Sequence, residues 1–158
     1  MNDLNMLVRI AGMTSVNQRR HLIAQTCHET GRYRWMQEIA DGSAYEMRSD
    51  LGNTKIGDGR KFKGGGVIQL TGRYNYQRFS DWLERNGMKD DKVMQEGASY
   101  IAKKYPFLSA VCWIQENNWA DVCEGTDVYQ VTRVLNGGYN GIDDRLHYYG
   151  LACRYIAE

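Results

Sequence analysis

The sequence predicts a mainly α domain with a small β insertion, on the strength of three observations. Helical spacing of apolar residues recurs on both sides of a central segment, and the chain has a single proline. Between Gly31 and Thr71 no helical period is sustained, and an irregular stretch of this length is usually functional or disordered. The 158 residues, 42% of them hydrophobic, suffice for one core, so we expect a single domain over residues 1–158.

Two helices are expected before the irregular segment. Apolar residues at helical spacing between positions 4 and 11 predict a short first helix. Thr14 or Ser15 is expected to cap a second helix, which runs through residues 28–30. Gly31 then fits the left-handed position that follows a helix end.

The irregular segment itself is predicted to be a small β-hairpin lobe with binding loops. Apolar residues between positions 62 and 70 are expected to form its short strands. Glycines in this segment suit tight turns that need a positive φ.

Helices return after the irregular segment. Gly87 is expected to end the first of them and Pro106 the second. Asp127 is expected to cap the fourth, and Asp143 or Asp144 the fifth. The apolar positions of the five helices fall within 76–83, 93–105, 108–115, 128–135 and 146–156.

Composition argues against several classes of protein. The formal net charge of +1 gives no basic stripe, so we expect no nucleic-acid partner. No apolar run is long enough to cross a bilayer, and the first residues lack the pattern of a secretory signal, so we expect synthesis in the cytoplasm. The four cysteines form no CxxC pair, which argues against a zinc ribbon.

The sequence lacks the residue spacing of two further motifs, the metalloprotease motif and the phosphate-binding loop. His28-Glu29 would need a second histidine four residues later to form a metalloprotease motif, and position 32 is Arg32. The glycine-rich run from Gly57 to Gly66 is followed by no Gly-Lys-Ser/Thr, so it is not a phosphate-binding loop. We therefore expect neither a metal nor a cofactor.

Carboxylates are the remaining candidates for chemistry. Hydrolysis of a glycosidic bond usually needs two of them, one that donates a proton and one that activates water. Glu29 suits the first role, because the end of a helix disfavours negative charge. Spacing alone does not rank the candidates for the second role, which are Glu38, Asp41, Glu46, Asp50 and Asp58.

Several ordered motifs resemble glycoside hydrolase family 19, whose members include chitinases and phage endolysins. They cover roughly the whole chain, and the match is densest between Gln25 and Tyr76. Together they are more specific than any one motif alone. They are His28-Glu29-Thr30-Gly31, the segments 44–54 and 57–64, the signature Gly66-Val67-Ile68-Gln69-Leu70-Thr71-Gly72-Arg73-Tyr74-Asn75-Tyr76, and the group Val131-Thr132-Arg133, Asn136-Gly137-Gly138, Asn140-Gly141 and Arg145.

The resemblance implies a lysozyme-like fold with a glycan cleft and assigns roles to individual residues. Glu29 would be the general acid, Glu46 the general base, and Thr71 would help to hold the attacking water. Glu38 is the reserve candidate for a catalytic carboxylate. Family 19 enzymes invert the anomeric centre, which implies carboxyl groups ~6.5–9.5 Å apart. Residues that would contact sugar or order the cleft are His28, Tyr45, Gln69, Tyr74, Asn75, Asn136 and Arg145.

The chain departs from the family pattern at one position. Relatives usually have Gly-Arg-Gly where this chain has Gly64-Gly65-Gly66, so an arginine expected near the cleft is missing. Lys63 or Arg73 could supply the missing charge. The departure also raises an alternative, in which the protein binds glycan but cleaves it weakly.

The leading hypothesis is an endolysin that hydrolyses the glycan strands of bacterial peptidoglycan and lyses the host. It would be a monomer and a lysozyme-type enzyme, made in the host cytoplasm and acting in the periplasm. Release would require a holin-type partner that permeabilises the inner membrane. The enzymatic alternative is a chitinase acting on chitin, and a zinc peptidase is a distant option.

Overall fold

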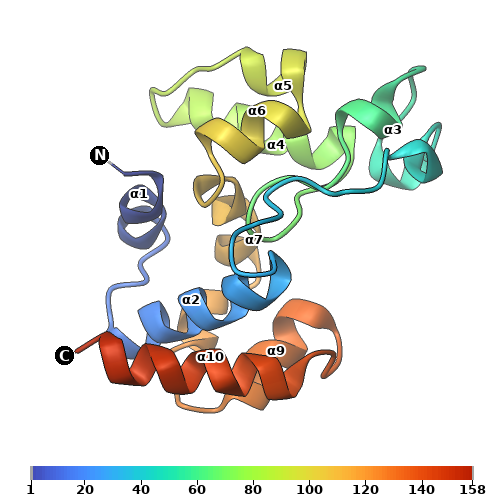
Figure 1. The fold of residues 1–158 in the computed structure, drawn as a ribbon. Helices are drawn as coiled ribbons and strands as arrows, with labels where there is room; N and C mark the ends of the chain where they lie inside the picture. The colour runs from blue at the N-terminus through green and yellow to red at the C-terminus, as the bar shows by residue number, and fades with distance from the viewer. Residues whose placement is uncertain (1, 158) are drawn as a thin grey trace. The chain divides into compact units, whose positions relative to one another are not determined.

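The computed structural model describes residues 2–157, which form helices joined by turns and loops (Figure 1). Packing of the backbone divides the chain into two compact units. Unit 1 comprises Met1–Arg34 and Trp113–Glu158, and unit 2 comprises Trp35–Cys112. The predicted mainly α class is confirmed, and the helices are consistent with a lysozyme-like fold.

Unit 1 is organised around two long helices that pack against each other, α2 and α10, with α9 against both (Figure 1). Trp119 is fully buried in this unit, and its ring meets that of Trp113 edge to face, with centroids 5.7 Å apart. The helices that lie wholly in unit 1 are α1 (Asp3–Ile10), α2 (Val16–Glu29), α8 (Trp119–Val122), α9 (Val128–Asn136) and α10 (Ile142–Tyr155). The boundary between the units falls within α7 (Val111–Glu116).

Helix α2 begins and ends as the sequence predicts, and the structure selects Ser15 as its cap. The Ser15 hydroxyl accepts a hydrogen bond from the Gln18 amide at 3.2 Å, and the Gln18 side chain accepts one from the Ser15 amide at 2.9 Å. This reciprocal pair satisfies two amides that a helix start otherwise leaves without partners. At the other end Gly31 has a φ of 54°, the left-handed conformation expected there.

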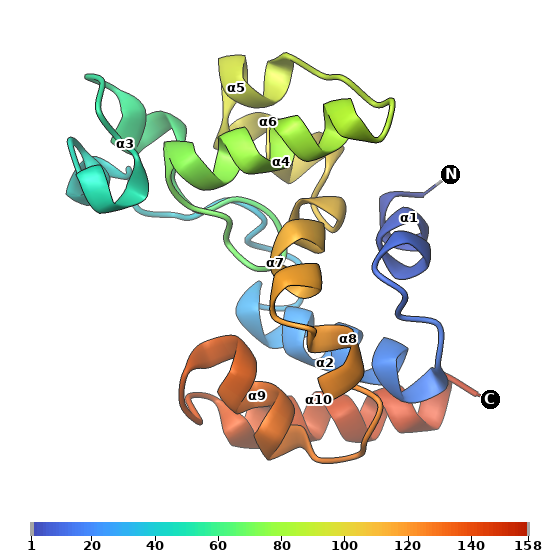
Figure 2. The same ribbon diagram turned by 180° about the vertical axis from the view of Figure 1, so that it is seen from behind.

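Unit 2 has its core under helix α4. Phe79 stacks with Trp82 and meets Tyr105 edge to face, with ring centroids 5.6 Å apart in the second pair. Figure 2 shows α4, α5 and α6 gathered together, apart from the looped segment that carries α3. The elements of unit 2 are η1 (Ser43–Tyr45), η2 (Ser49–Leu51), α3 (Asp58–Lys61), α4 (Arg73–Arg85), α5 (Lys92–Glu96), α6 (Ala98–Lys104) and η3 (Leu108–Ala110).

The predicted β-hairpin does not form. Within the described residues, pairing is limited to two isolated bridges, Gln37 with Gly65 and Gly65 with Leu70. Positive φ angles at Gly66 and Gln69 turn the chain before a ladder can extend. The lobe is therefore built from short turns and 3₁₀ helices, which leaves backbone amides available to bind side chains.

Two other boundaries differ from the prediction. The helix expected over 93–105 is broken at Gly97, whose φ is 62° and where a Cβ would lie only 2.1 Å from the Lys61 carbonyl oxygen. The last helix begins at Ile142, so Asp143 and Asp144 lie in its first turn and do not cap it. Acidic residues there still interact favourably with the helix dipole.

The cap of α9 is confirmed. The Asp127 carboxylate accepts hydrogen bonds from the amides of Tyr129 and Gln130.

Within residues 2–157 the structure contains no helix whose length and apolarity would let it traverse a bilayer.

Replacing Ser15 with alanine should lower the free energy of unfolding by about 1 kcal/mol, because the Gln18 amide loses its acceptor. Urea denaturation measures this change. Thr14→Ala, at the exposed neighbouring position, is the matched control and should change stability by less than about 0.5 kcal/mol. Equal effects of the two substitutions would contradict the assignment of the cap.

Candidate active site

Glu29, the last residue of α2, is anchored by a buried arginine of unit 1. The Arg145 guanidinium, from the first turn of α10, donates through Nη2 to Oε1 of Glu29. Arg145 is 0% exposed, whereas the Glu29 side chain is 24% exposed. Among the described residues the side-chain contacts of Glu29 all use Oε1. One carboxylate oxygen is thus fixed by Arg145, and within residues 2–157 Oε2 has no side-chain contact of this kind.

Arg145 is itself fixed by three polar partners. Besides Glu29, it donates through Nη1 to Oε1 of Gln25 and through Nε to the Asn140 carbonyl oxygen at 3.0 Å. Gln25 in turn donates to the Thr132 hydroxyl at 3.0 Å, and both side chains are fully buried. A buried charge is tolerated only when it is paired and hydrogen-bonded. This chain of contacts therefore determines where the Glu29 carboxylate lies.

His28 is fixed by two contacts close to Glu29. Its Nδ1 lies 2.7 Å from Oδ2 of Asp144. Its ring lies against Gly141, where an added Cβ would come within 2.0 Å of the His28 Cε1. The α2 end and the α10 start are thus tied together by His28–Asp144 as well as by Glu29–Arg145.

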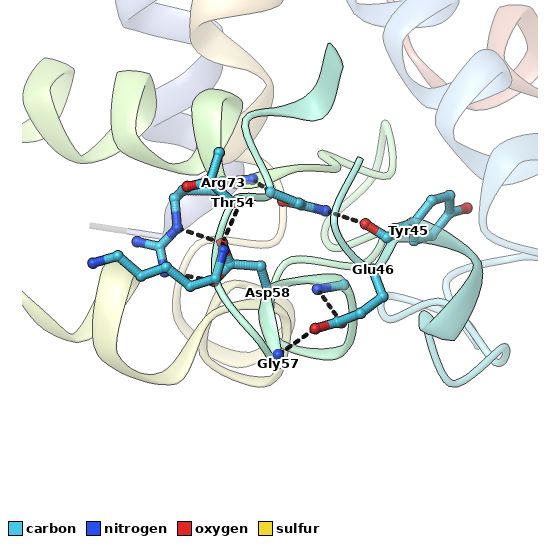
Figure 3. A network of polar contacts seen from close by, with 9 residues as sticks. Tyr45, Glu46, Thr54, Gly57, Asp58 and Arg73 are labelled. Carbon is cyan, nitrogen blue, oxygen red and sulfur yellow. Dashed lines mark hydrogen bonds and ion pairs between the residues drawn. The ribbon is translucent and has the colours of Figure 1, made fainter. Parts of the chain in front are cut away.

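Glu46 lies in unit 2, directly after η1, and its carboxylate binds backbone amides (Figure 3). Oε1 accepts from the amide of Gly57, and Oε2 accepts from that of Gly59 at 2.9 Å. A Cβ at position 59 would lie 2.6 Å from the Glu46 amide nitrogen, so only glycine fits there. The Gly57-Asp58-Gly59 turn therefore forms a cradle that sets the orientation of Glu46.

The cradle is held from behind by Asp58, which is buried between a cation and two amides (Figure 3). Arg73 donates to both Asp58 oxygens, at 2.8 and 2.5 Å, and the amides of Thr54 and Lys55 donate to Oδ2 at 3.0 Å. The Arg73 guanidinium holds the pKa of Asp58 below its ordinary value. Asp58 is thus a structural residue and not an open carboxylate.

Asn53 connects the Glu46 segment to α4. Its fully buried side chain donates to the Tyr45 carbonyl oxygen at 2.8 Å and accepts from the Arg73 amide at 2.8 Å. The Glu46 segment is therefore braced by two residues of the same loop, Asn53 and Asp58.

The remaining acidic candidates differ in their surroundings. Glu38 is half-buried and accepts from the Tyr45 hydroxyl and the Gly64 amide, both at 2.9 Å. Its hydrogen bond raises the pKa of the Tyr45 phenol. Asp41 and Asp50 are exposed and pair with Arg60 and Arg48, respectively. Glu46 and Glu38 are thus the partly buried carboxylates that the lobe holds with backbone amides.

Side chains of the family signature make local contacts in unit 2. The Thr71 hydroxyl donates to the Gln69 carbonyl oxygen at 2.8 Å. The Asn75 side-chain amide donates to the Thr71 carbonyl oxygen at 2.9 Å. Gln69 donates to the Gly66 carbonyl oxygen at 2.9 Å. Tyr74 is 59% exposed. Thr71, Gln69 and Asn75 thus brace the loop that precedes α4.

The missing arginine at position 65 has a steric explanation. Gly65 is buried, and a Cβ there would lie 2.7 Å from the Tyr76 hydroxyl. Of the two residues suggested as substitutes, Lys63 donates to the Ala40 carbonyl oxygen, and Arg73 pairs with the Asp58 carboxylate. Asn136 ends α9 with an exposed side chain.

Sequence reasoning missed three residues that the structure makes central: Gln25, Thr132 and Asn53. Gln25 lies four residues before Glu29, so helical periodicity alone would have placed both on one face. Thr132 and Asn53 carry no such local signal.

Among residues 2–157 no group of three or more His, Cys, Asp or Glu side chains is arranged to hold a metal ion.

Comparison with known proteins shows a similarity to family 19. No family model matches the sequence. A protein of Haemophilus influenzae, described as a glycosyl hydrolase family 19 domain-containing protein, is 34% identical over 118 residues. The match covers 75% of this chain and 54% of that protein, so the chain spans about half the length of this curated relative. The likeness supports a relationship to family 19 and, at a coarse level, a glycoside hydrolase.

Replacing Gln25 with leucine should lower the free energy of unfolding by about 1–3 kcal/mol, because a buried guanidinium N–H and the Thr132 hydroxyl both lose a partner. Urea denaturation tests this. Gln95→Leu makes the same chemical change at an exposed position and should alter stability by less than about 0.5 kcal/mol. A Gln25→Leu protein as stable as the wild type would show that Arg145 does not depend on Gln25.

Stability should depend on pH through Asp58. Folding lowers the pKa of Asp58 from its ordinary value of 3.8. The ion pair of Asp58 with Arg73 therefore stabilises the fold fully above pH 3.8, and this stabilisation is lost as pH falls through the lower pKa of the folded protein. The free energy of unfolding of the wild type should therefore decline as pH falls below about 4. In Asp58→Asn this decline should be shallower. Parallel curves for the two proteins would refute the assignment.

Proposed function

We propose that this chain is a family 19 glycoside hydrolase that cleaves the glycan strands of bacterial peptidoglycan, in the manner of a phage endolysin. One observation carries the proposal: a buried arginine anchors Glu29, the glutamate of the His-Glu-Thr-Gly motif, in a chain 34% identical to a family 19 relative. A general acid must be held within hydrogen-bond reach of the group that it protonates, and this anchor fixes the position of Glu29.

Glu29 is the proposed acid. Arg145 binds Oε1, so Oε2 is the oxygen proposed to face the leaving glycosidic oxygen. Because Gln25 and the Asn140 carbonyl fix the guanidinium, the position of the Glu29 carboxylate is set before substrate binds. The contacts of His28 with Asp144 and Gly141 keep the end of α2 in place beside it.

Glu46 is the proposed base. Its oxygens accept from the amides of Gly57 and Gly59, which orient the carboxylate proposed to take a proton from water. Thr71 is proposed to help to hold that water, and attack from the face opposite the leaving group would invert the anomeric centre. Sugar contacts are proposed for His28, Tyr45, Gln69, Tyr74, Asn75 and Asn136.

Peptidoglycan is proposed as the substrate because the motifs resemble the phage branch of the family. The enzyme would be a monomeric, lysozyme-type hydrolase in which both units serve one catalytic domain. It would be made in the host cytoplasm and reach the wall after a holin-type protein has permeabilised the inner membrane.

The test is mass spectrometry of the products from purified Gram-negative peptidoglycan. Glu29→Gln and Glu46→Gln should each reduce turnover by about 10²–10⁴-fold, because each removes one proton-transfer group. Glu38→Gln, which changes the other amide-held carboxylate of the lobe, is the matched control and should retain most activity. Thermal unfolding of all variants shows whether each one folds.

The products decide between outcomes. Reducing-end N-acetylmuramic acid that disappears with Glu29→Gln would support a muramidase, and reducing-end N-acetylglucosamine would change the linkage but keep the mechanism. Cut peptides with intact glycan would refute a glycosidase. A larger loss with Glu38→Gln than with Glu46→Gln would assign the base to Glu38.

A further inference from the structure

A pocket of about 320 Å³ adjoins the proposed base in unit 2. It is lined by Ser43, Glu46, Ile56, Gly57 and Arg60. Gly57, whose amide donates to Glu46 (Figure 3), is thus also one of the residues that line the pocket. A substituent on a sugar that Glu46 acts upon would therefore meet this pocket.

The pocket combines an apolar wall with a cation that is free to change partners. Ile56 is 96% exposed, so its whole side chain is available for contact. The Arg60 side chain is 71% exposed, and its contact with Asp41, at 3.3 Å, is between two exposed groups. Surface pairs of this kind contribute little to stability, so Arg60 can bind another anion at small cost.

The charge around the pocket is positive once the paired groups are set aside. The segment 55–63 carries Lys55, Arg60, Lys61 and Lys63, and its one acid, Asp58, is buried and paired with Arg73. Glu46, the acid that lines the pocket, has both oxygens bound by backbone amides. An anionic group entering beside Ile56 would therefore meet Arg60 without a competing free acid from this segment.

We propose that this pocket recognises the substituent on the 3-oxygen of N-acetylmuramic acid, which carries a methyl group and a carboxyl-derived group. Ile56 contacts the methyl group and Arg60 binds a carboxylate. In a peptide-free glycan that carboxylate is the lactyl group itself, and in intact peptidoglycan it belongs to the stem peptide. Neutral chitin lacks the substituent. The inference rests on the proposed function and adds the residues that separate peptidoglycan from chitin.

The experiment compares kcat/KM on three substrates: intact peptidoglycan, glycan strands stripped of peptides by an amidase, and chitohexaose. Arg60→Gln should lower kcat/KM about tenfold on the carboxylate-bearing substrates, since a charge-assisted hydrogen bond is lost, and leave chitohexaose unchanged. Lys61→Gln removes the same charge from the adjacent exposed residue, which does not line the pocket, and should affect none of them. Asp41→Asn, which frees Arg60, should raise kcat/KM on the anionic substrates.

Each result separates the possible sources of the carboxylate. A loss with Arg60→Gln on stripped strands alone assigns the lactyl carboxylate, and a loss on intact peptidoglycan alone assigns a carboxylate of the stem peptide. A loss on both anionic substrates shows that Arg60 binds whichever carboxylate the substituent carries. Equal losses on all three substrates, no loss on any, or equal effects of Arg60→Gln and Lys61→Gln would overturn the inference while the enzyme remains a hydrolase. If the wild type cleaves none of the three, the proposed function fails and the inference fails with it.

Discussion

The buried guanidinium of Arg145 is the constraint on which the arrangement of unit 1 depends. A cation with no access to solvent must be neutralised and hydrogen-bonded inside the protein. Here the carboxylate comes from the end of α2, the amide from the preceding turn of α2, and the carbonyl from the loop before α10. The same contacts that make the charge tolerable thus bring together the end of one helix and the start of another, and they place Glu29 where they meet.

Unit 2 also contains a buried charged side chain, the carboxylate of Asp58. Its anion, Asp58, is buried with Arg73 and two amides, while Glu46 is held by backbone alone. The glycines on either side of Asp58 make this possible, since one adopts a positive φ and the other leaves no room for a side chain. Within this loop, the side chain of Asp58 holds the turn in place, and the main chain of the turn holds the carboxylate proposed to do chemistry.

Much of the fold could be predicted because its signals are local. Ser15, Gly31 and Asp127 act within a few residues, and helical spacing finds α1, α2, α4 and α9. The break at Gly97 depends on the Lys61 carbonyl, a contact distant in sequence that no pattern near Gly97 reveals. The network around Glu29 spans 116 residues, so the family motifs pointed to Arg145 but not to its burial or its partners. The roles of Glu29 and Glu46 remain predictions.

The cradle of Glu46 has a consequence for how this lobe can change over generations. Its amides belong to every amino acid except proline, so the carboxylate keeps its place whatever side chain stands at the exposed positions around the turn. Lys55, Ile56 and Arg60 can therefore vary without moving Glu46. Selection can act on these surface residues while the Glu46 carboxylate keeps its place, and an engineer can randomise the same three positions without displacing it.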